Sequence, residues 1–127
     1  LDQFLRLMRQ GREEKRSFLT PARERFFRAV CHAAAHGGLL RLHLLQLEET
    51  PVAAAICFDY QGQRLLYNSG FSPEHSRLSV GLLLKAFSLQ QAIEQGLEYY
   101  DFLRGNEPYK YDLGGRDRRV FRLEVRR

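Results

Sequence analysis

The stretch that decides the fold of this chain is residues 67–81, YNSGFSPEHSRLSVG, where a predicted strand leads into a predicted helix. Gln63–Phe71 has the aromatic, β-branch-tolerant pattern of a strand, and Ser72-Pro73 ends it. The residues that follow Gly81 indicate a helix, because apolar residues recur there at the spacing of one helical face. These are Leu82, Ala86, Leu89 and Ile93.

The short polar segment before this predicted helix is suited to an anion. Backbone N–H groups at a helix N-terminus lack partners within the helix, and the helix dipole is positive there. Ser79 is the predicted N-cap, Gly81 lets a ligand approach the backbone, and Arg77 adds charge. A phosphate is the ligand that this arrangement favours, and the alternative is that Ser79 simply caps a core helix.

Length and cysteine usage set the broad class. At 127 residues the chain fits one domain with a real core, so we expect a single domain over residues 1–127. It begins with Leu rather than Met, and we expect it to be the C-terminal part of a longer protein. No apolar run is long enough to span a bilayer, which predicts no membrane insertion. Cys31 and Cys57 lie in apolar patterns and are predicted to be buried free thiols, as suits a reducing cytoplasm. No Cys/His spacing predicts a metal site.

The chain is basic, with a net charge of +5 and a pI near 9.6. A basic balance admits nucleic acid, an anionic membrane surface or a polyanionic small molecule as partner. Much of the excess lies at the C-terminus, where the arginines do not interleave with stacking aromatics, and this disfavours nucleic acid. These arginines are Arg116, Arg118, Arg119, Arg122, Arg126 and Arg127.

Elsewhere the patterns predict helices first and strands after them. A helix is expected in Leu1–Gln10, a charged loop at Gly11–Lys15, and a second helix from the Thr20-Pro21 start to Gly37-Gly38. Strands are expected from Leu39, at Val52–Tyr60, at Leu97–Leu103 and at Val120–Arg126. His43 is predicted to be an exposed strand residue rather than a catalytic base.

The order of these elements predicts a mixed sheet. Three consecutive strands, joined by short turns such as Gln61-Gly62, form an antiparallel meander. The strand, helix and strand that follow give a right-handed crossover with two parallel strands. Such a pair can part at its carboxyl ends and leave a slot for a ligand.

A polar and aromatic segment, RGNEPYKYDLGG at residues 104–115, follows the predicted strand Leu97–Leu103. Polar residues gathered at the carboxyl end of a strand are typical of a site. With residues 67–71 and 77–84, the run DFLRGNEPYK at 101–110 resembles the CelD/BcsL-like family of GNAT-type acetyltransferases, which is related to the FemABX peptidyltransferases. The resemblance covers the chain from about Phe4 to Gly114.

This resemblance implies an α+β, three-layer GNAT fold, with a mixed, mostly antiparallel sheet, helices on both faces and a splayed parallel strand pair. It also implies an acyl-CoA co-substrate such as acetyl-CoA, with no metal. The pantetheine arm would lie between the splayed strands, with backbone N–H groups near Asn68 and Ser69 facing the thioester carbonyl. In the common signature a glycine stands where this chain has Val80. The residues implied to hold the pyrophosphate are Arg77, Leu78, Ser79, Val80 and Gly81.

Amide formation needs a base for the amine and a proton for the leaving thiolate. Asp101 and Glu107 are the base candidates, each acting through a water, although either could be a capping or ion-pairing carboxylate. Tyr109 or Tyr111 could protonate the thiolate, or be part of the core. Lys110 is a candidate for stabilising the oxyanion or holding a substrate phosphate, with a solvated lysine as the alternative.

Three residues are predicted to bind substrate: Tyr67, Tyr111, and Arg104, which either holds an anionic acceptor or pairs with Asp101. The expected function is acyl-CoA-dependent N-acyl transfer to a small-molecule amine, such as an amino sugar or a cell-envelope or exopolysaccharide precursor, in the cytoplasm. The alternatives are a non-catalytic GNAT-like module of a larger protein and a FemABX-like transferase that uses aminoacyl-tRNA.

Overall fold

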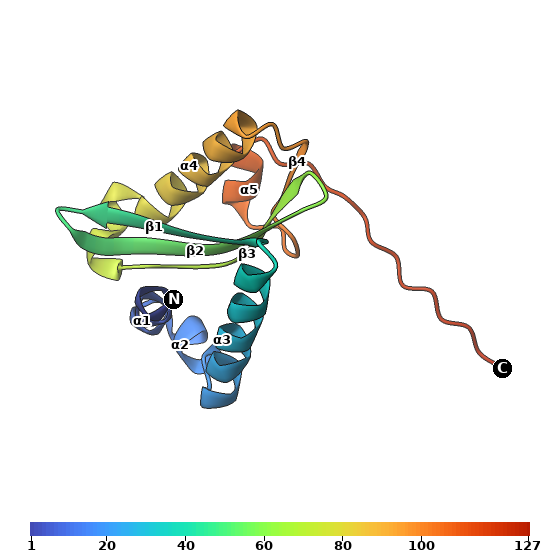
Figure 1. The fold of residues 1–127 in the computed structure, drawn as a ribbon, viewed down its shortest axis with the longest axis horizontal. Coiled ribbons are helices and arrows are strands. Elements are labelled where there is room, and N and C mark those ends of the chain that lie inside the picture. Colours follow the sequence, from blue (N-terminus) through green and yellow to red (C-terminus); the bar gives the residue numbers. More distant parts are fainter.

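The computed structural model describes residues 1–127 and shows one sheet with helices on both of its faces (Figure 1). Three helices on one face come first in the chain: α1 (Asp2–Gln10), α2 (Glu13–Phe18) and α3 (Pro21–His36). The sheet consists of β1 (Leu40–Leu47), β2 (Thr50–Tyr60), β3 (Gln63–Phe71) and β4 (Tyr99–Asp101). The other face carries the 3₁₀ segment η1 (Pro73–Leu78), α4 (Val80–Glu94) and α5 (Pro108–Asp112). The predicted α+β class is confirmed.

The sheet is mixed, as predicted. Its order is β1-β2-β3-β4, with antiparallel pairing along β1, β2 and β3 and parallel pairing between β3 and β4. The parallel pairing covers only Gln63–Leu65 against Tyr99–Asp101. Because β3 continues to Phe71 without β4 beside it, the two strands part at their carboxyl ends and leave one edge of β3 open.

The sheet separates two hydrophobic cores. On one face α1 and α3 bury residues such as Phe4 and Phe27 against Ile56, and on the other α4 buries Val80 and Leu84. Apolar burial contributes roughly 25 cal/mol per Å² and is the main stabilising term on both faces. Both cysteines, one in each core, are buried and free, which confirms the prediction for them.

A fully buried arginine fixes α4 on the sheet. Arg64 of β3 makes two hydrogen bonds to the carboxylate of Asp59, at 2.7 and 2.9 Å. Its remaining N–H groups donate to the Ser88 carbonyl and to Gln91, both at 3.0 Å, and to Gln95 at 3.1 Å. This network ties two adjacent strands to the second half of the helix, and it therefore sets how far α4 lies from the parting of β3 and β4.

The face of α4 that packs on the sheet differs from the predicted one. The buried residues follow a spacing of four, whereas Leu82 and Ile93 of the predicted face are 39% and 68% exposed. The helix carries apolar side chains nearly all round, so that periodicity alone did not select a face. The residues that the sheet covers are Val80, Leu84, Ser88 and Ala92.

Three predicted boundaries were wrong. The loop predicted at Gly11–Lys15 is interrupted by α2, and the strand predicted at Leu97–Leu103 shortens to β4, in which Tyr99 is 65% exposed. Val120–Arg126 forms no strand, because its alternating residues have no neighbouring strand to pair with and extend away from the sheet (Figure 1). No helix here combines the length and apolar character needed to cross a membrane.

Candidate active site

A hollow of about 320 Å³, which we call the slot, lies between the last residue of β3 and the start of α4. Its walls come from five parts of the chain: Arg12 just before α2, the end of β3, η1, the first turns of α4, and α5. Ser79, Val80 and Gly81 of the predicted phosphate loop line the slot, whereas Arg77 and Leu78 of that loop do not. Tyr109, predicted from the other end of the sequence motif, lies in the same hollow.

The first turn of α4 is left without a side-chain cap. Ser79 stands at the N-cap position, but its backbone is left-handed, at φ +50°, and its side chain makes no capping hydrogen bond. The alternative that Ser79 simply caps a core helix is therefore wrong. Gly81 is explained by packing, because a Cβ there would lie 3.2 Å from Cδ1 of Phe71. The outcome is an uncapped, electropositive helix end that faces a hollow.

Three cations that sequence reasoning missed border the slot. Arg12 and Lys85 line it, and Lys15 of α2 donates a hydrogen bond to the Ser69 carbonyl on the open edge of β3. The Lys85 ammonium lies 3.9 Å from the ring centre of Tyr109. Burial, reinforced by the charge of Lys15, lowers the pKa of Lys85 to about 8. A signal for Lys85 was present in the sequence, since it is the one charged residue in the apolar run Leu82–Phe87.

The predicted residues of β3 lie at an irregularity in the strand. The register with β2 shifts between Ile56 and Cys57, opposite Tyr67. The Tyr67 ring contacts Phe27 of α3, at 5.7 Å between ring centres, so it belongs to the aromatic cluster on the other face of the sheet. Asn68 lies at the open edge, and its side chain accepts a hydrogen bond from the Ser69 amide at 2.8 Å. That amide is therefore occupied unless the Asn68 side chain turns away.

The most specific part of the sequence motif folds into a loop around the Lys110 ammonium, which we call the lysine clasp. Lys110 is 6% exposed, and its Nζ donates to the carbonyls of Arg104 and Gly105 at 2.9 and 3.2 Å. The third partner is Glu107, with Oε2 at 2.7 Å, and this bond lowers the pKa of the Glu107 carboxyl. Gly105 is required by the same loop, because its φ is +109° and a Cβ would lie 2.6 Å from the Glu107 carboxylate.

The clasp bears on the roles predicted for Lys110 and Glu107. The alternative of a solvated lysine is wrong for Lys110, and its three donors are already used by the loop. Glu107 precedes α5 at the N-cap position, but its side chain makes no capping bond. A carboxylate paired with Lys110 is a poorer base than a free one.

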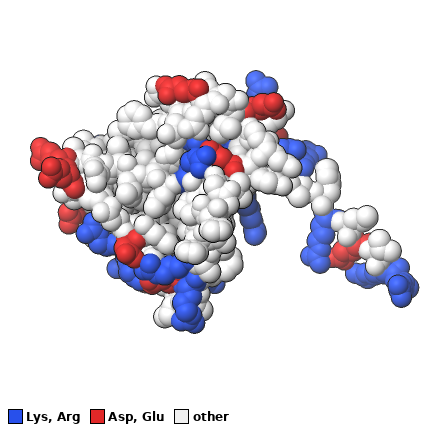
Figure 2. Space-filling view, viewed as in Figure 1, with Lys and Arg blue, Asp and Glu red and all other residues white.

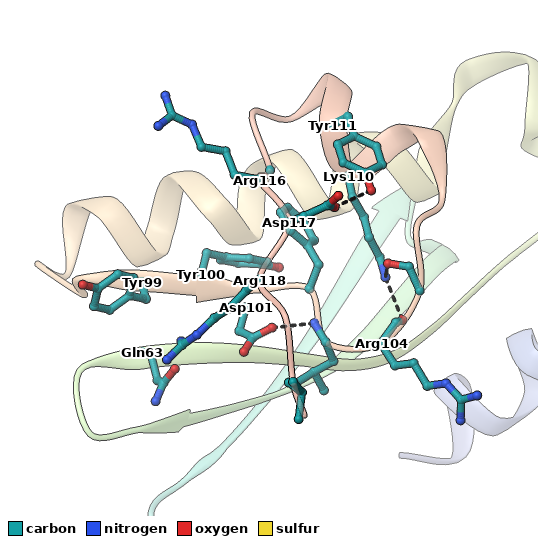
Figure 3. A pocket seen from close by; sticks show the side chains of 15 residues that line it. Gln63, Tyr99, Tyr100, Asp101, Arg104, Lys110, Tyr111, Arg116, Asp117 and Arg118 are labelled. Atoms are coloured by element: carbon teal, nitrogen blue, oxygen red, sulfur yellow. Dashed lines mark hydrogen bonds between the residues drawn. The ribbon is translucent and has the colours of Figure 1, made fainter. Parts of the chain in front are cut away.

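A second hollow, of about 690 Å³, lies between β4, the loop that follows it and the tail (Figure 3). Asp101, Arg104, Lys110 and Tyr111 line it, so these predicted residues are brought together, but away from the phosphate loop. Asp101 accepts a hydrogen bond from the Leu103 amide at 2.7 Å, where the backbone of Leu103 is left-handed at φ +57°. Asp101 and Arg104 form no ion pair, and in Figure 3 the Arg104 side chain points away from the hollow.

One strand residue was predicted wrongly. His43 is half-buried rather than exposed, and its Nε2 lies 3.4 Å from the Ser88 hydroxyl under α4. The same hydroxyl accepts a hydrogen bond from Tyr100 at 3.1 Å and lies 3.8 Å from the Cys57 sulfur. Burial, with Arg64 nearby, lowers the pKa of His43, so the ring is a neutral part of this packing at pH 7.

A comparison with models of protein families identifies the family of this chain. The model of the acetyltransferase (GNAT) domain matches residues 1–111, most of the chain. The chain belongs to the GNAT acetyltransferase family. This confirms the GNAT fold and the predicted family at that level. A search of curated proteins finds no match.

Solved structures of aminoglycoside acetyltransferases share the fold. The 6'-N-acetyltransferase AAC(6')-IG from Acinetobacter haemolyticus has a TM-score of 0.65 at 15% identity, and the alignment covers 98% of this chain and 91% of that one. AAC(6')-Iy, solved with CoA, has a TM-score of 0.53 at 15% identity over 85% of this chain and 96% of that one. The enzyme meta-AAC0020 from a soil metagenomic sample, solved with sisomicin, has 0.52 at 16% identity over 70% and 67%. At such identities the likeness concerns the fold alone.

Proposed function

We propose that this GNAT domain transfers an acetyl group from acetyl-CoA to the primary amine of a small molecule. The observation that carries the proposal is the slot itself: an uncapped, electropositive helix end opens into a hollow beside a strand with a free edge. The family membership supports acetyl transfer, and the solved neighbour that holds CoA supports the choice of donor. The proposal narrows the expected acyl-CoA donor to acetyl-CoA.

The donor fits the slot in one direction. Its pyrophosphate is held by the backbone N–H groups of the first turn of α4, from Val80 onward, with the Ser79 hydroxyl nearby. Its pantetheine arm would lie along the open edge of β3, from Phe71 towards Asn68, and would form strand-like hydrogen bonds with Ser69 once the Asn68 and Lys15 side chains release its amide and carbonyl. The thioester would then lie within reach of Tyr109 and Lys85, which both line the slot and contact each other.

Two side chains supply the proton transfers in this proposal. The amine nitrogen attacks the thioester carbonyl carbon, the C–N bond forms and the C–S bond breaks. Lys85, whose pKa is lowered to about 8, takes a proton from the attacking amine in its neutral form. Burial, with Glu107 nearby, raises the pKa of Tyr109 to about 12, so its phenol stays protonated and donates to the leaving thiolate. Asp101 lines the second hollow, and its role as an alternative base stays a prediction.

Titration calorimetry with acetyl-CoA and a thiol-release assay test the proposal together. We expect saturable binding that CoA competes for, and Tyr109→Phe should lower kcat on the order of 10²-fold with little change in the KM for acetyl-CoA. The matched control is Tyr111→Phe, which removes an equivalent hydroxyl outside the slot. Absence of saturable binding by the folded chain would refute the proposal and favour a non-catalytic module, whereas steeply salt-dependent binding of tRNA would favour the aminoacyl-tRNA alternative.

We also propose the finer assignment to the CelD/BcsL-like branch, with an amino sugar or cell-envelope precursor as acceptor. The support is the DFLRGNEPYK run at 101–110, four residues of which form the clasp: Arg104, Gly105, Glu107 and Lys110. Two buried, free thiols suit a reducing compartment, and we propose that the domain acts in the cytoplasm.

A further inference from the structure

The charge of the slot is not balanced by the protein. Arg12 and Lys85 line it, Lys15 lies close to both, and none of the three forms an ion pair with an acidic residue. The acidic side chain close to these lysines is Glu107, and it is already paired with Lys110. Like charges that are partly shielded from water repel one another. An arrangement of this kind is stabilised when an anion binds.

The proposed donor uses only one wall of the slot. Its phosphates lie at the first turn of α4, whereas Arg12 and Lys15 approach from the helical layer on the other face of the sheet. Lys15 reaches the carbonyl of Ser69, beside the predicted path of the thioester. Figure 2 shows lysine and arginine side chains over this helical layer with some acidic side chains among them, and a further acidic group at the end of the β1–β2 hairpin. Arg12 and Lys15 are therefore left over for a second substrate when the donor occupies the first turn of α4.

We propose that the amine acceptor carries an anionic group, a carboxylate or a phosphate, which Arg12 and Lys15 hold at the mouth of the slot. This inference rests on the proposed function and adds the chemical class of the acceptor. It separates this chain from the aminoglycoside acetyltransferases that share its fold, because aminoglycosides are polycations and three uncompensated cations would repel them. A fork of Arg12 N–H groups with the Lys15 ammonium suits either oxyanion.

Inorganic phosphate and sisomicin, each added to protein saturated with CoA, are the probes that test this inference. Saturation fills the phosphate sites of the donor, so any remaining anion site belongs to the acceptor. By NMR titration we expect phosphate to shift the signals of Arg12 and Lys15 saturably and sisomicin to leave them unchanged. Arg12→Glu should weaken phosphate binding about tenfold or more, while Arg16→Glu, the same charge change on an exposed residue of α2, should not.

The possible outcomes separate failure of the proposed function from failure of the inference about the acceptor. If CoA itself does not bind, the proposed function fails. If CoA binds and then abolishes phosphate binding at Arg12, these cations serve the donor and the inference is overturned. Binding of sisomicin in preference to phosphate would overturn it as well. Where phosphate binds, glucosamine 6-phosphate and L-glutamate, compared with glucosamine in the thiol-release assay, tell a phosphate acceptor from a carboxylate one.

Discussion

Replacing Lys110 with methionine should destabilise the protein by opening the lysine clasp. The substitution keeps the length of the side chain and removes three hydrogen bonds, to the Arg104 and Gly105 carbonyls and to Glu107. A hydrogen bond that involves a charged group contributes about 1.5–3 kcal/mol. Water can reach the exposed Glu107 carboxylate, and methionine recovers some apolar burial, so we expect a net loss of about 2–4 kcal/mol in the free energy of unfolding.

Urea unfolding followed by circular dichroism measures this loss. The matched variant is Glu107→Gln, which removes only the ion pair, and because the Glu107 side chain is 55% exposed it should cost about 0.5–1 kcal/mol. The larger effect of Lys110→Met would show that the two carbonyls, rather than the ion pair, depend on this ammonium. A Lys110→Met protein as stable as the wild type, but with kcat strongly reduced, would refute the reasoning and restore Lys110 as a catalytic cation.

Three further changes have defined outcomes in the same unfolding assay. Arg64→Met removes five hydrogen bonds and leaves the buried Ser88 carbonyl without the guanidinium that donates to it, so it should cost about 3–5 kcal/mol. Arg41→Met removes a partly exposed partner of Asp59, which keeps its bonds to Arg64, and should cost less than about 1 kcal/mol. Gly105→Ala forces a side chain onto φ +109° against Glu107 and should cost about 1–3 kcal/mol. Lys85 has a pKa of about 8 in the fold, below its ordinary 10.5, so the unfolded chain binds more protons between these values. Stability should therefore rise from pH 8 to 10.5, and Lys85→Met should flatten this rise.

Local patterns were enough to place most of the elements. The Thr20-Pro21 start was predicted because both signals act within one turn, and the Thr20 hydroxyl does accept a hydrogen bond from the Arg23 amide at 3.3 Å. The bounds of β3 agree with the prediction, since a turn at Gln61-Gly62 and a proline at 73 fix both ends. Where the outcome depended on a distant neighbour, prediction failed. Val120–Arg126 alternates like a strand, yet pairing requires a second strand that local sequence does not supply.

The same contrast between local signals and distant neighbours explains why only part of the candidate site was predicted. Ser79–Gly81 and Tyr109 were singled out by motif, and the fold brings them into one hollow. Arg12 and Lys15 carried no local signal, because a charged segment after Gly11 is ordinarily a solvated loop, and only the fold places Lys15 against Ser69, which is 54 residues away. The roles predicted for Asp101 and Arg104 stay predictions, since the structure gives them a hollow of their own.

The slot has walls from four elements, β3, η1, α4 and α5, and from Arg12 just before α2, and these span most of the chain. No fragment of the domain can hold the donor, because each wall depends on a different stage of the assembly. Ligand affinity therefore reports on completion of folding as well as on chemistry, and acetyl-CoA should raise the melting temperature of the whole domain in one cooperative step. A mutation far from the slot that destabilises any one of the four elements would therefore raise the apparent KM for the donor in an enzyme assay.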